Sequence, residues 1–290
     1  MGQKDIAEKT LEAYNDVFAD IVNVLLFNGE REIKEKDLED ATPVSIYKAD
    51  GKFHSQERDI AKFWQEYNIR IAIYGLENQT VKDKTMPIRV MSYDVASYKQ
   101  QIQDRKRPRK PLYPVVTLVL YFGNRRWEKP RSLFETMNVP DKLKSYISDY
   151  RINVFEIAYL SDEQVKMFKS DFRIVADYFV QMRKNKNYVP SKKVIKHVAE
   201  VLQLLKILTK DDKYEFNENF IKTKGEKMTM DRWLSNTIEN SEKIGEKKGE
   251  LSTIYKILKK GRITIEEAAS DIGMTVEQLL AGFKEYNLVL

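Results

Sequence analysis

The most hydrophobic segment of the chain is residues 112–122, which read Leu-Tyr-Pro-Val-Val-Thr-Leu-Val-Leu-Tyr-Phe. A continuous apolar run of this length, rich in β-branched and aromatic residues, is typical of a strand covered on both faces. Residues 69–74 and 151–160 are two further strand candidates. Helical patterns flank these strands over residues 5–28, over residues 86–103 and onward from Ser161, a candidate helix cap. This order predicts a mixed α/β fold, with a sheet core flanked by helices.

Polar groups follow the strand candidate at residues 69–74, after Gly75. Glu77 and Gln79 are two residues apart, so on an extended chain their side chains project to one side. Upstream, residues 57–64 form another strand candidate, and the segment between the two strands looks like a turn. If the two strands form an antiparallel hairpin with a turn centred near residues 67 and 68, the numbers of any two residues that face each other sum to about 136. Asp59 then faces Glu77 at a distance of roughly 5 Å.

Two carboxylates held this close repel each other unless a cation lies between them. Oxygen ligands favour Mg²⁺ or Mn²⁺, and Mg²⁺ is commonly held by one or two carboxylates, waters and a substrate phosphate. The pattern therefore predicts a magnesium site on Asp59 and Glu77, with manganese as the second candidate ion. The alternative is a solvated strand end that carries two unrelated acids.

The chain has no cysteine and only two histidines, His54 and His197. Disulfides, thiolate zinc sites and cysteine nucleophiles are thereby excluded, and a histidine-rich metal site or a Ser-His-Asp triad has little support. No apolar run reaches the roughly 18 residues that cross a bilayer. The polar first residues are unlike a secretory signal. We expect a soluble, cytoplasmic protein without a membrane partner.

The formal net charge is +6, which permits nucleic acid as a partner. A dense basic run consists of Arg105, Lys106, Arg107, Arg109 and Lys110, and Arg125 and Arg126 follow the next strand. Such runs neutralise phosphates, so DNA is the expected partner. The alternative is an exposed loop with solvated charges. Lys82 and Lys84 are either phosphate contacts or ordinary surface lysines.

The predicted division of the chain is a main domain over residues 1–225 and a helical region over residues 226–290. In the second part, Thr264 and Thr275 are expected to cap two helices on either side of a turn at Gly273. The spacing of small residues resembles a helix-turn-helix unit. The second helix starts Val-Glu-Gln, without the Arg, Lys or Asn that read bases. Homo-oligomerisation through these helices therefore competes with DNA binding as their role.

Together these features resemble the bacterial Rpn recombination-promoting nucleases, also called YhgA-like putative transposases, of the PD-(D/E)XK nuclease superfamily. The likeness covers about residues 10–180, and its matching segments are residues 15–20, 58–59, 73–79, 86–98, 114–121 and 168–172. The resemblance implies a restriction-endonuclease-like fold, with residues 1–225 as a PD-(D/E)XK nuclease-like domain. It also implies metal-dependent DNA endonuclease activity linked to recombination or mobile elements.

Carried over by position, the resemblance makes Asp59 the motif aspartate and Glu77 the acid of the second motif. Gln79 takes the place of the motif lysine. An acid on the first helix assists in such enzymes, and Asp20 is the choice here, with Asp16 as the rival. A glutamine can orient water but brings no charge. A second hypothesis therefore stays open, in which a catalytically weak or inactive nuclease fold acts in DNA binding or assembly.

Overall fold

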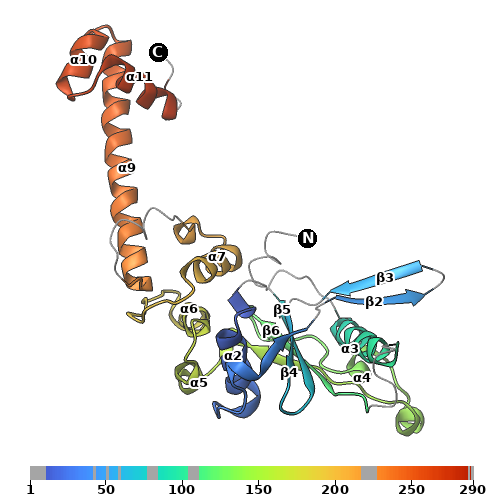
Figure 1. Cartoon of the computed structure of the whole chain (residues 1–290). Helices are drawn as coiled ribbons and strands as arrows, with labels where there is room; N and C mark the ends of the chain where they lie inside the picture. The colour runs from blue at the N-terminus through green and yellow to red at the C-terminus, as the bar shows by residue number, and fades with distance from the viewer. Residues whose placement is uncertain are drawn as a thin grey trace. The chain divides into compact units, whose positions relative to one another are not determined.

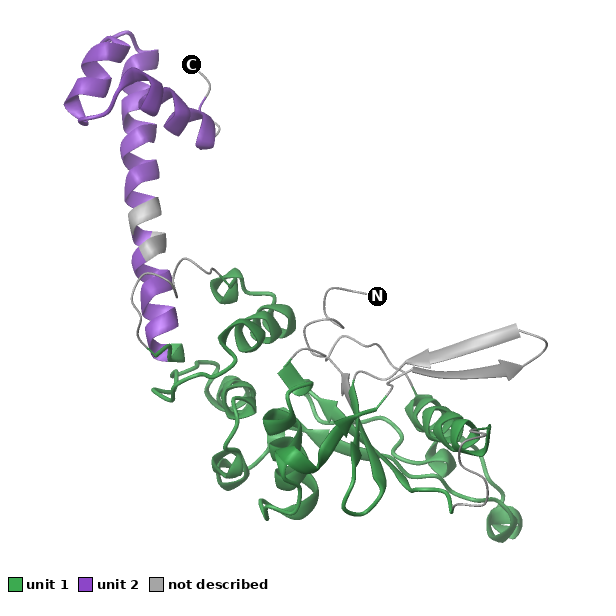
Figure 2. Ribbon diagram, in the orientation of Figure 1, with its two compact units in different colours: residues 1–230 green, residues 231–290 purple. Residues whose placement is uncertain are grey.

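The computed structural model describes residues 11–41, 44–49, 52–57, 60–76, 84–103, 111–216, 227–286 and 288. Contacts between residues divide the chain into two compact units, residues 1–230 and residues 231–290 (Figure 2).

Unit 1 is built on a five-stranded mixed sheet with the strand order β1-β4-β5-β6-β7 (Figure 1). Its strands are β1 (Leu38–Asp40), β4 (Ile60–Trp64), β5 (Ile69–Leu76), β6 (Val115–Tyr121) and β7 (Asn153–Glu156). The first three are antiparallel neighbours, whereas β5, β6 and β7 are parallel. A separate two-stranded antiparallel sheet is formed by β2 (Val44–Ala49) and β3 (Lys52–Glu57).

Helices lie on both sides of the sheet (Figure 1). Among the described residues, the α-helices of unit 1 are α2 (Asn15–Phe27), α3 (Met86–Gln103), α4 (Leu133–Thr136), α5 (Asp162–Met167), α6 (Phe172–Asn185) and α7 (Val198–Thr209). Short 3-10 turns are η1 (Glu35–Asp37), η2 (Asp141–Tyr146), η3 (Ile157–Tyr159) and η4 (Asp212–Tyr214). The predicted fold class, a mixed sheet flanked by helices with a helical C-terminal region, is confirmed. No helix among the described residues combines the length and apolar character needed to cross a membrane.

The strand β6 forms the centre of the core, as its sequence predicts. Leu118, Val119 and Leu120 are all fully buried, so both faces of the strand are covered. Val119 packs in a cluster with Val90 of α3 on one face. Just after the strand, the rings of Phe122 and of Phe179 in α6 lie 5.3 Å apart. The strand begins after Pro114, since proline cannot donate a ladder hydrogen bond.

The register of the β4–β5 hairpin differs from the expected one. Ile60 pairs with Ile73 and Trp64 with Ile69, so paired residue numbers sum to 133 rather than 136. The reason is the position of Asn68, which has a left-handed φ of 52°. It is the last residue of a four-residue loop instead of its centre. The register is shifted by three residues, which is an odd number. A side chain of β4 and a side chain of β5 that were expected on the same face of the sheet are therefore on opposite faces.

Unit 2 contains α9 (Met230–Lys259, with Met230 at the boundary), α10 (Ile265–Asp271) and α11 (Val276–Glu285). The predicted caps are present: Thr264 and Thr275 each form a capping box with the residue three positions later. Gly273 has a φ of +65°, which a side chain would disfavour, and it provides the predicted turn. The core of the unit consists of Leu251, Ile254, Ala268, Ala269, Leu279 and Phe283.

Candidate active site

The strands next to the predicted metal ligands meet at one edge of the sheet. β4 begins at Ile60, directly after Asp59, and β5 ends at Leu76, directly before Glu77. Since Ile60 pairs with Ile73 in an antiparallel ladder, the start of β4 and the end of β5 belong to the same edge. Asp59, Glu77 and Gln79 themselves lie outside the described residues.

The observed register corrects one argument for this site. Direct cross-strand pairing of Asp59 with Glu77 required paired numbers to sum to about 136. In the described ladder Ile60 faces Ile73, so this pairing does not follow, and neither does the shared face that it implied. What still relates the two acids is that Asp59 directly precedes β4 and Glu77 directly follows β5, at the same end of two neighbouring strands.

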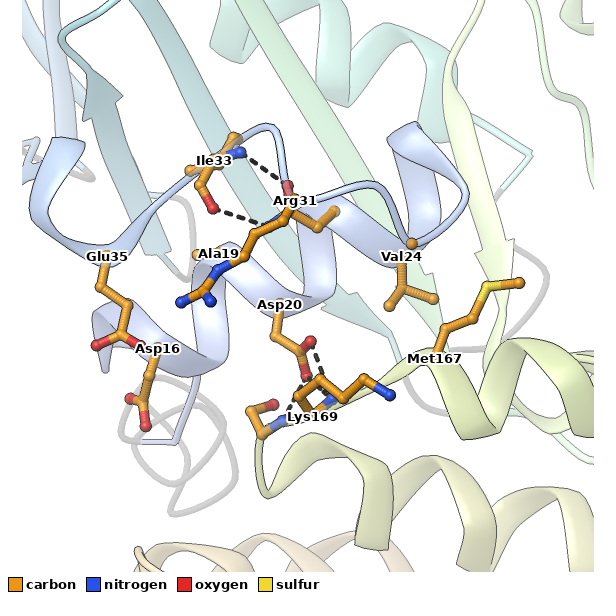
Figure 3. A pocket seen from close by; sticks show the side chains of 12 residues that line it. Asp16, Ala19, Asp20, Val24, Arg31, Ile33, Glu35, Met167 and Lys169 are labelled. Atoms are coloured by element: carbon orange, nitrogen blue, oxygen red, sulfur yellow. Dashed lines mark hydrogen bonds between the residues drawn. The ribbon is translucent and has the colours of Figure 1, made fainter.

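Asp20 projects from α2 towards the connection between α5 and α6 (Figure 3). Its Oδ1 and Oδ2 accept the backbone N–H of Lys169 at 3.0 and 2.8 Å. Its Oδ2 also accepts the N–H of Ser170 at 2.7 Å. A carboxylate that accepts two backbone donors fixes a chain segment, so these contacts describe a structural anchor. The assisting role of Asp20 in catalysis stays a prediction.

Asp16, the rival of Asp20, faces a different group of side chains. Its Oδ2 accepts a hydrogen bond from Lys196 Nζ at 2.6 Å, and His197 Nε2 lies 3.2 Å from both carboxylate oxygens. Burial raises the pKa of Asp16, but the hydrogen bonds with Lys196 and His197 outweigh burial and lower it overall. The His197 ring also stacks on Tyr14, with centroids 3.7 Å apart. These contacts join α2 to the start of α7.

A pocket of about 380 Å³ opens beside both acids. It is lined by α2, by the segment that follows this helix, and by the connection after α5 (Figure 3). Asp16, Asp20 and Glu35 bring carboxylates to its wall, and Arg31 and Lys169 bring cations. No group of three or more His, Cys, Asp or Glu placed to hold a metal occurs within the described ranges, this pocket included.

The predicted basic run Arg105, Lys106, Arg107, Arg109 and Lys110 lies outside the described residues, as does Lys82. Lys84 is described, and its side chain is exposed just before α3. Sequence reasoning did not identify Arg131, Tyr159 and Arg183, which gather near the end of β7. Their positions in the sequence are far apart, and no local pattern links them.

The chemistry of the predicted ligands fits a hard divalent cation. Two carboxylates supply only oxygen ligands, which suit Mg²⁺ or Mn²⁺ rather than zinc or copper.

Comparison with known families gives one match. The family model described as "Putative transposase, YhgA-like" matches residues 68–215, about half of the 290 residues. Searches of curated proteins and of solved structures found no match. The matched segment includes Glu77 and Gln79 and the strands β5, β6 and β7, whereas Asp59 and Asp20 precede it. The chain belongs to the family of YhgA-like putative transposases.

Proposed function

We propose that the protein is a metal-dependent DNA endonuclease that hydrolyses phosphodiester bonds in recombination or in the movement of mobile elements. One observation carries this proposal: β4 and β5 are antiparallel neighbours, and Asp59 precedes the first while Glu77 follows the second at the same edge. Membership of a family described as putative transposases supports it, because transposition requires DNA strands to be cut. Action on DNA suits a cytoplasmic location.

In this proposal Asp59 and Glu77 hold Mg²⁺, or Mn²⁺ in its place. Such an ion, when bound, polarises the scissile phosphate and lowers the pKa of a coordinated water. Gln79 orients the attacking water through its side-chain amide. Because glutamine adds no positive charge near the phosphate, the reaction is expected to be slower than with a lysine at this position.

The test is nicking of supercoiled plasmid with Mg²⁺ by the full-length chain. The proposal expects wild-type cutting that EDTA stops, and loss of cutting in Asp59→Ala and in Glu77→Ala. Glu66→Ala is the matched control, because Glu66 is an exposed acid in the loop of the same hairpin, at the opposite edge. Unchanged cutting by either active-site variant would remove that residue from the mechanism.

Gln79 favours a second candidate function, in which the fold binds DNA without cutting it. Binding that survives EDTA, combined with no cleavage in either Mg²⁺ or Mn²⁺, would establish this second function and exclude the first.

We also propose that unit 2 assembles copies of the chain. The exposed side chains of α11 include Glu277, Gln278, Lys284 and Glu285, a set with more acids than bases that suits protein contacts better than DNA. Light scattering would compare the full chain with a chain that ends at residue 225. Loss of assembly on truncation supports the proposal, and an unchanged number of copies per particle contradicts it.

A further inference from the structure

Arginines from distant parts of the sequence gather at the edge where the parallel strands end. Leu76 pairs with Tyr121 and Tyr121 pairs with Glu156, so the C-terminal ends of β5, β6 and β7 lie side by side at one edge of the sheet. Ligands of sheets with parallel strands commonly bind outside this carboxyl edge. The segment after β6 supplies Arg125, Arg126 and Arg131, and α6 supplies Arg183. These four residues are named the arginine cluster.

A single carboxylate orders two members of the cluster. Glu156 Oε2 accepts hydrogen bonds from Arg131 Nη2 at 3.0 Å and from Arg126 Nη1 at 3.4 Å. Glu156 Oε1 accepts the backbone N–H of Trp127 at 2.8 Å. One carboxylate neutralises one positive charge, so the two guanidinium groups around Glu156 keep a positive excess.

Tyr159 holds the cluster together from the end of η3. The guanidinium of Arg126 lies 4.0 Å from the centre of the Tyr159 ring, and that of Arg183 lies 4.6 Å from it. Arg183 Nε also donates to the carbonyl of Ala158 at 2.6 Å. These cation–π contacts fix the two side chains in advance, which reduces the rotamer entropy lost on binding a ligand.

The cluster nevertheless faces water. The Arg126 side chain is 63% exposed and that of Arg131 is 42% exposed. Arg125 is exposed and has no hydrogen bond or ion pair with the described residues. Glu128 and Glu135 are exposed acids in the same segment and offset part of the charge; Glu135 also accepts the backbone N–H of Arg131. Exposed guanidinium groups held in place in this way are suited to phosphate oxygens.

We propose that the arginine cluster binds the phosphate backbone of DNA beside the bond to be cut, with Arg125 and Arg126 as the direct contacts. This inference rests on the proposed nuclease function, since β5 leads into Glu77 at the same edge. Neighbouring strands are about 4.8 Å apart, so β5 to β7 span about 10 Å. That distance corresponds to about three nucleotides of one strand at a rise of about 3.4 Å each.

The test is binding of a DNA duplex by the full chain in EDTA, where nothing is cut, over a range of salt concentrations. Removing one phosphate-binding side chain should make the plot of log binding constant against log salt concentration shallower by about 0.9. At about 0.1 M salt this change corresponds to about eightfold weaker binding. Arg125→Ala and Arg126→Ala should each show this change. Arg125→Lys keeps the positive charge, so its slope should stay close to that of the wild type. Thermal unfolding of each variant checks that unit 1 stays folded.

Arg151→Ala is the matched control. Arg151 has an 86% exposed side chain close to Asp149 and lies just before the start of β7, where it pairs with Ser132, rather than at the end of β7 beside Glu156. Its replacement should leave the slope unchanged. If wild type binds DNA and Arg125→Ala and Arg126→Ala behave like Arg151→Ala, the cluster assignment is overturned while the nuclease proposal stands. If wild type neither binds nor cuts DNA, both are overturned.

Discussion

Replacing Asp20 by alanine tests whether this carboxylate anchors the α5–α6 connection. The side chain accepts the backbone N–H groups of Lys169 and Ser170, which are 149 and 150 residues away in the sequence. Asp20→Ala leaves both donors without their charged acceptor. We therefore expect lower stability of unit 1, whatever the effect on catalysis.

The size of the effect follows from the two donors. A hydrogen bond to a charged group contributes about 1.5–3 kcal/mol, which gives about 3–6 kcal/mol for two. Lys169 is exposed, so water replaces part of the missing interaction and the lower value, about 3 kcal/mol, is expected. For a unit of this size, that loss lowers the Tm by about 6–12 °C.

The assay is thermal unfolding followed by circular dichroism. Asp20→Asn keeps one acceptor oxygen without the charge, and should fall roughly midway between wild type and Asp20→Ala. Glu32→Ala, the loss of an exposed acid shortly after the same helix, is the control and should have a wild-type Tm. A Tm for Asp20→Ala equal to that of Glu32→Ala would refute the anchoring role.

Three further predictions concern other parts of the chain. The pKa of Asp16 is lowered in the folded state, so its stabilisation is present above its unfolded pKa of about 3.9 and is lost as pH falls through the folded pKa. The difference in unfolding free energy between wild type and Asp16→Asn should thus shrink as the pH falls below about 4; a difference that stays constant there would contradict this. Thr117→Val removes the buried donor that Thr117 Oγ1 offers to Asp94 at 2.7 Å, and denaturant unfolding should show a loss of about 1–3 kcal/mol. Leu279→Ala leaves a cavity at a fully buried position in unit 2 and should lower the stability of that unit by about 2–5 kcal/mol. Amide hydrogen exchange should become faster in α11, whereas the exchange rates in α6 should stay the same.

Local patterns predicted much of the fold. The apolar run around Leu118 and the helical spacing over residues 86–103 identified β6 and α3, because each element buries side chains with its own period. Ser161, Thr264 and Thr275 cap helices as expected, since the capping box depends only on residues three apart.

Features that depend on tertiary packing were beyond local patterns. The hairpin register changed by three because Asn68 ends its loop, and either position suits a residue that tolerates positive φ. The contact between Asp20 and Ser170 joins segments 150 residues apart. The same holds for Arg126 and Arg183, whose guanidinium groups both lie against the Tyr159 ring.

The most direct test of the account is a crystal structure of the protein soaked with Mn²⁺, examined by anomalous scattering. The account predicts one metal peak bound by carboxylate oxygens of both Asp59 and Glu77, at about 2.0–2.2 Å. Carboxylates that face apart, or an arginine or lysine side chain between them in place of the ion, would contradict it.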